Sequence, residues 1–111
     1  MEMERNKERY TFDRPEFAQV QFRIDRGPNR YEVWTLNLMD SSREGLAILV
    51  TPDDFDLFAV IGEGGEIKDL AFFGAGARIK ANGLVRHITK IKEGKFKGCY
   101  ILGVEAHDIN A

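Results

Sequence analysis

Two short groups of polar residues carry side chains that can bind the parts of a small anionic ligand. The first spans residues 40–45 and reads D-x-S-x-x-G. The carboxylate of Asp40 can accept hydrogen bonds from the guanine N1–H and exocyclic amine, and Ser42 can donate one to a phosphate oxygen. Gly45 lets a ligand approach the backbone closely, and turn N–H groups can form an anion-binding nest. An ordinary turn remains the alternative, because Asp, Ser and Gly are also common turn residues.

The second group is an R-x-x-x-R pattern formed by Arg5 and Arg9. A guanidinium group can bind phosphate through two parallel donors, donate to guanine O6 and N7, and stack on a base. The alternative is a solvated run of charges, because Glu4 and Glu8 lie beside the two arginines. If both groups act together, the arginines supply the cations that a phosphate site requires.

Composition excludes several function classes. The chain has 111 residues, 43% of them hydrophobic, which fits one domain with a core. Its net charge of −2 argues against binding to DNA or RNA, which needs a basic field. Cys99 is the single cysteine, so neither an intramolecular disulfide nor a cysteine-based metal cluster is expected. We also expect a cytoplasmic protein without membrane insertion, because no long apolar segment is present, and no enzyme, because no catalytic constellation is readable.

Residues 1–16 are predicted to form a flexible N-terminal arm, and residues 17–111 a folded domain. The arm holds five acidic and four basic side chains but few apolar ones, and Pro15 disfavours helix at its end. Period-two alternation then predicts a strand with Ala18, Val20, Phe22 and Ile24 on one face. A second strand places Trp34, Leu36 and Leu38 on one side and ends near Met39. The unbroken apolar run 46–50 predicts a strand buried on both faces.

A helix is predicted after residue 50, because Thr51 can cap it, Pro52 suits its first position, and acidic residues follow. It would end near Gly62, and the alternative is a strand over residues 56–61. Further strands are predicted at 66–73, 77–81, 84–91 and 96–105, with turns at 74–76, 82–83 and 92–95. Six or seven short strands favour a small antiparallel barrel or sandwich.

The two motifs, in this order and in this β context, resemble the PilZ domain family, whose members bind cyclic di-GMP. The resemblance covers nearly the whole chain and includes Gly83-Leu84-Val85-Arg86 and Tyr100-Ile101-Leu102-Gly103-Val104. It implies an all-β protein built on a six-stranded antiparallel barrel, acting as a bacterial receptor for the second messenger. The ligand-binding residues that it implies are Arg5, Arg9, Asp40, Ser42 and Gly45. Ligand would order the arm and present an altered surface to a protein partner.

The chain also departs from the family pattern, which leaves a second function open. Glu44 stands where many members have glycine. Ala106 stands where many members have an aromatic residue directly after the last Gly-x-x, which here is residues 103–105. With Glu4 and Glu8, these departures favour the alternative of a degenerate protein–protein adaptor that binds no nucleotide. Arg43 and Arg86 are expected to be solvated, with contact to the ligand as the alternative, and roles without ligand contact are expected for His87, His107 and Cys99.

Overall fold

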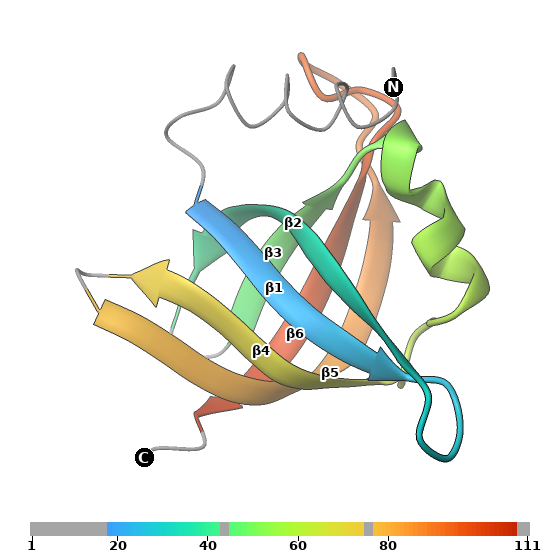
Figure 1. The fold of residues 1–111 in the computed structure, drawn as a ribbon. Helices are drawn as coiled ribbons and strands as arrows, with labels where there is room; N and C mark the ends of the chain where they lie inside the picture. Colours follow the sequence, from blue (N-terminus) through green and yellow to red (C-terminus); the bar gives the residue numbers. More distant parts are fainter. Residues whose placement is uncertain (1–17, 43–44, 75–76, 109–111) are drawn as a thin grey trace, which may run out of the picture.

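The computed structural model describes residues 18–42, 45–74 and 77–108, and these form a closed barrel of six antiparallel strands (Figure 1). The strands pair in the order β1-β2-β3-β6-β5-β4. Their bounds are β1 Ala18–Asp25, β2 Tyr31–Ser41, β3 Gly45–Val50, β4 Glu66–Gly74, β5 Ala77–Lys90 and β6 Tyr100–Asp108. The predicted six-stranded antiparallel barrel is therefore confirmed. The predicted arm lies outside the described residues.

Alternating side chains of the strands fill the interior. In β1, Val20, Phe22 and Ile24 are buried in one hydrophobic cluster, as the alternation predicted. Leu46, Ile48 and Val50 of β3 join the same cluster, and Leu49 is also buried although it lies outside that cluster. The prediction that this strand is buried on both faces is therefore confirmed at Leu49 but not at Ala47, which is half-buried on the same outer face. Among the described residues, the apolar side chains of the strands occupy the interior of the barrel, so the polar residues of the 40–45 motif are expected on its outer wall.

One predicted turn is wrong, because β5 runs without a break through Asn82 and Gly83. Asn82 pairs with His107, and Gly83 pairs with Ala106 of β6. The Asn82 side chain accepts a hydrogen bond from the Asp69 N–H at 3.3 Å. A Cβ atom at Gly83 would lie only 2.6 Å from Cγ1 of Val104. The asparagine and the glycine thus serve contacts with neighbouring strands, and they do not reverse the chain.

The connection between β5 and β6 is longer than the predicted turn at 92–95. It spans residues 91–99 and is closed by bonds from the Ile91 N–H to the Cys99 carbonyl and from the Gly98 N–H to the Ile91 carbonyl. Gly94 and Gly98 have φ values of 88° and 92°, which favour glycine. Strand β6 therefore begins at Tyr100, four residues later than predicted.

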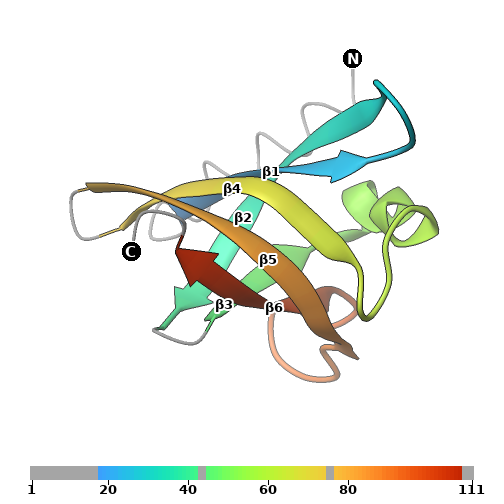
Figure 2. The same cartoon turned by 90° about the horizontal axis from the view of Figure 1, so that it is seen from below.

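A short helix follows β3, so the helix prediction is right and the alternative strand is wrong. The element η1 is a 3-10 helix over Pro52–Ala59, kinked at Asp54, and it ends before Gly62. Thr51 makes no side-chain capping bond, and its carbonyl accepts the Asp54 N–H at 2.8 Å instead. Phe55 and Phe58 pack edge-on against Tyr100. In Figure 2, η1 lies outside the ring of strands. Neither η1 nor any other helix in the described ranges could span a membrane.

Candidate functional site

A β-bulge in β2 decides that Asp40 faces the outside of the barrel. Leu36 and Leu38 point into the core, and strict alternation would turn Asp40 inward as well. The pairing shifts by one residue at Met39, since Leu38 pairs with Ile48 but Asp40 pairs with Ala47. The bulge therefore re-aims the carboxylate outward, where Asp40 is exposed. Strand β2 continues to Ser41, which pairs with Leu46, and so runs beyond the predicted end near Met39.

A second bulge turns two consecutive residues of β5 outward. Val85 is buried and pairs with Val104, whereas His87 pairs with Gly103, so the register shifts at Arg86. Arg86 and His87 are both exposed. A regular strand would have sent one of these two side chains into the core.

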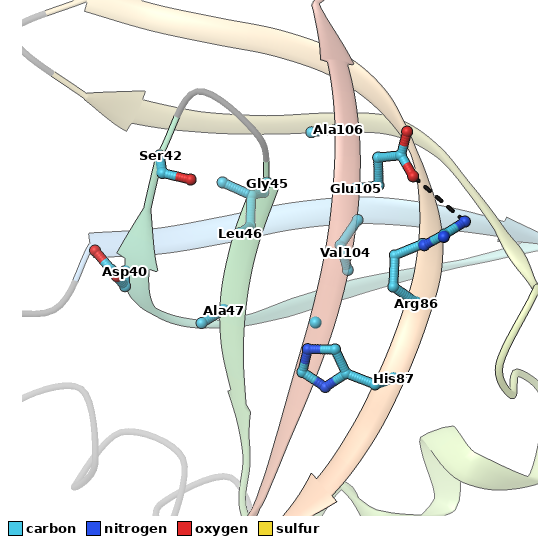
Figure 3. Close-up of a pocket in the computed structure, with 11 residues that line it drawn as sticks. Asp40, Ser42, Gly45, Leu46, Ala47, Arg86, His87, Val104, Glu105 and Ala106 are labelled. Carbon is cyan, nitrogen blue, oxygen red and sulfur yellow. Dashed lines mark ion pairs between the residues drawn. The ribbon is translucent and has the colours of Figure 1, made fainter.

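These outward residues form a row across four adjacent strands. Asp40 of β2 pairs with Ala47 of β3, Ala47 pairs with Gly103 of β6, and Gly103 pairs with His87 of β5. Ala47 and Gly103 have little or no side chain, so the surface is hollowed at the middle of the row. Asp40 and His87 carry the polar side chains at its two ends (Figure 3). The row forms the floor of a pocket of about 660 Å³ on the outer wall.

The structure brings Asp40, Ser42 and Gly45 together in this pocket. The Ser42 N–H donates to the Gly45 carbonyl at 2.9 Å and closes the turn between β2 and β3. Oδ1 of Asp40 accepts the Ser41 N–H at 2.9 Å, which fixes the carboxylate at the rim. The other predicted ligand-binding residues, Arg5 and Arg9, lie outside the described part of the chain, as do Arg43 and Glu44.

Gly45 has a structural role that the sequence did not reveal. It pairs with Glu105, and a Cβ atom at this position would lie 2.2 Å from the Val104 carbonyl oxygen. That contact is with backbone, so it cannot be relieved by moving a flexible side chain. Glycine is therefore required here for β3 to pair with β6, whether or not a ligand also approaches the backbone.

Three polar residues of the pocket were missed or given other roles by the sequence reasoning. Arg86, His87 and Glu105 line it, and Nη1 of Arg86 lies 3.4 Å from Oε1 of Glu105 (Figure 3). The pair is largely exposed, so its contribution to stability is small. The signal that could have found them is the spacing of three between the inward residues Val85 and Ile88. That spacing breaks the period of two and indicates a bulge.

The described residues offer no metal centre and no activated thiol. No group of three or more His, Cys, Asp or Glu side chains among them is placed to hold a metal ion. Cys99 is buried, and burial raises the pKa of its thiol above the ordinary value. The sulfur is therefore protonated near neutral pH and is a poor nucleophile.

Comparisons with known proteins show the fold alone. No protein-family model matches the sequence, and the comparison with curated proteins finds no match. A solved structure described as MrkH, a novel c-di-GMP-dependent transcription regulatory factor, has a similar fold with a TM-score of 0.57. The two chains share 13% identity over 85% of this chain. The match spans only 40% of the other chain, so it is similar to one part of that protein.

Proposed function

We propose that this protein is a regulatory module of the PilZ type that binds cyclic di-GMP on the outer wall of its barrel and has no catalytic activity. The observation that carries the proposal is the pocket in which Asp40, Ser42 and Gly45 lie together. Asp40 accepts hydrogen bonds from the Watson–Crick edge of a guanine, and Ser42 donates to a phosphate. The fold similarity to part of a c-di-GMP-dependent regulator agrees with this assignment.

The charges of the described pocket explain why the proposal needs the N-terminal arginines. Asp40 and Glu105 are acidic, and the guanidinium of Arg86 is paired with Glu105. A cyclic dinucleotide carries two phosphate charges, so further cations must enter the site. We assign that role to Arg5 and Arg9, each of which can bind phosphate through two donors.

The place where β1 begins supports this role. Ala18 pairs with Leu38, two residues before Asp40, so β1 begins at the end of the barrel where β2 finishes (Figure 1). Strand spacing and rise put the Cα atoms of Ala18 and Asp40 about 8 Å apart. Arg9 precedes Ala18 by nine residues, and a chain of that length can extend to about 30 Å. The arginines are thus covalently within reach of the pocket.

Binding by this route changes the surface of the protein. Ordering the backbone costs roughly 1–2 kcal/mol per residue, whereas each charge-assisted hydrogen bond contributes about 1.5–3 kcal/mol. Micromolar affinity corresponds to a net binding free energy of about −8 kcal/mol. Several charge-assisted bonds from both arginines are therefore needed to offset the cost of ordering the arm. The arm, once held across the pocket, presents a new surface to a protein partner.

One observation favours a second function, a protein–protein adaptor that binds no nucleotide. The described pocket contains two carboxylates, Asp40 and Glu105, against one arginine. Glu44 adds a further acid to the β2–β3 connection. If these acids outweigh Arg5 and Arg9, the same surface repels phosphate.

Calorimetric titration with cyclic di-GMP separates the two functions. Wild type should bind, and Arg5→Ala and Arg9→Ala should each bind at least about tenfold more weakly, a loss of about 1.4 kcal/mol or more. Arg30→Ala is the matched control, because it removes the same charge from the turn at the far end of β2. Absence of binding by wild type would exclude the receptor function, and equal affinities in all four proteins would exclude the role of the arm.

A further inference from the structure

The imidazole ring of His87 lies with one face over the backbone of Gly103. A Cβ atom at Gly103 would lie 2.2 Å from Nε2, 2.4 Å from Cε1 and 2.7 Å from Cδ2 of this ring. A point beyond the edge of the ring would be clearly closer to Nε2 than to its two neighbours. Such similar distances therefore place the point above the ring face. The opposite face of the imidazole must be turned away from the barrel, toward the pocket.

Three features fix the ring in this orientation. The bulge at Arg86 turns the His87 side chain outward. Nδ1 lies 3.1 Å from Oγ1 of Thr89, and this hydrogen bond fixes the rotation of the ring about the Cβ–Cγ bond of His87. The missing side chain of Gly103 leaves the space that the ring fills. A side chain held in one place before binding loses little entropy when a ligand packs on it.

The position of the ring in the pocket indicates which ligand group it would meet. It lies over Gly103, the third residue of the row Asp40–Ala47–Gly103–His87. The Cα atoms of Gly103 and Asp40 are two strand spacings apart, about 10 Å. The floor between them is the small side chain of Ala47. A bicyclic base stacked on the imidazole can therefore lie across Ala47 and direct its hydrogen-bonding edge toward the Asp40 carboxylate.

We propose that His87 is a stacking platform for one guanine of the bound dinucleotide, and that Gly103 lacks a side chain in order to seat it. This inference rests on the proposed function and adds a contact from β5, on the opposite side of the pocket from Asp40. Stacking on an aromatic ring does not depend on the charge of the ligand. The ring thus binds the base while other residues neutralise the phosphates.

Four variants test the platform by titration with cyclic di-GMP. His87→Ala should weaken binding by about 5- to 140-fold, the usual effect of removing one base-stacking ring, whereas His87→Phe should stay within about threefold of wild type. Gly103→Ala displaces the ring and should weaken binding as much as His87→Ala does. The double variant should be no weaker than His87→Ala, because the added methyl group then has no ring to displace. In NMR spectra, the His87 ring protons should shift upfield when ligand is added to wild type.

Each contrary result has a distinct meaning. If wild type binds and His87→Ala binds equally well, the stacking role is overturned and the proposed function stands. If His87→Phe is as weak as His87→Ala, an aromatic face is not what the ligand uses, and the role is overturned as well. If wild type does not bind cyclic di-GMP, the proposed function and this inference both fail. The His87 variants decide the question even if Gly103→Ala does not fold.

Discussion

Gly45 offers a sharp test, because the structure assigns it a steric role that is independent of any ligand. In Gly45→Ala the new methyl carbon would lie 2.2 Å from the Val104 carbonyl oxygen and 3.2 Å from the Val104 carbonyl carbon. Both atoms are backbone, so β3 and β6 must separate where Gly45 pairs with Glu105. Overpacking of this kind costs about 1–3 kcal/mol. For a domain of this size the melting temperature should fall by roughly 5–20 °C.

Gly62→Ala is the matched control for this substitution. A methyl group there would meet nothing within 4 Å, and its φ is not in the left-handed region. The same chemical change should therefore be neutral or stabilise by up to about 1 kcal/mol, by restricting the unfolded chain. Thermal unfolding followed by circular dichroism measures both variants. The steric reasoning is refuted if Gly45→Ala melts at or above the temperature of Gly62→Ala. A loss of ligand binding in Gly45→Ala must be corrected for this destabilisation before it is attributed to a lost contact.

Two further predictions concern the interior of the fold. Leu57 of η1 is fully buried, so Leu57→Ala should lower the free energy of unfolding measured in urea titrations by about 2–5 kcal/mol. Asp56 is exposed, so Asp56→Ala should change that free energy little. Comparable losses in the two variants would contradict the anchoring of η1 by Leu57. Burial raises the pKa of Cys99 above 9.0, so the folded state holds this proton more tightly than the unfolded chain does. The contribution of Cys99 to stability should therefore be constant below about pH 9 and decline as the pH rises above it toward the folded-state pKa. The stability of Cys99→Ala should decline less than that of wild type over this pH range. Identical pH profiles of stability in the two proteins would count against a raised pKa of Cys99.

The sequence predicted the elements whose pattern is local. In β1, apolar residues at every second position from Ala18 to Ile24 define a strand and its inward face without reference to any partner. The helix after β3 was predicted by Thr51 and Pro52, although its 3-10 geometry and its end at Ala59 were not. These signals depend on a few neighbouring residues, so they can be read from the chain alone.

Features set by pairing between strands could not be predicted in the same way. Whether Asp40 faces inward or outward depends on the bulge at Met39, and that bulge is defined only against β3. Asn82 and Gly83 have the composition of a turn, yet their roles are contacts with β4 and β6. For the candidate site, the motif at residues 40–45 identified one wall of the pocket. The opposite wall, with Arg86 and His87, depends on a register shift in β5 that composition does not reveal.

The outward row across β2, β3, β6 and β5 has a consequence for how this surface can diversify. Ala47 and Gly103 alternate with core residues of β3 and β6, and the two bulges turn Asp40 and His87 outward, so these positions can change without altering the residues that fill the core. Substitution at Asp40, Ala47 or His87 changes what the wall can recognise and leaves interior packing intact. Gly45 is different, because the backbone of Val104 already occupies the space of a side chain, whereas the space at Gly103 is filled by the His87 ring and changes with it. New specificities on this scaffold should therefore arise at the ends of the row and at Ala47, with Gly45 as the fixed point.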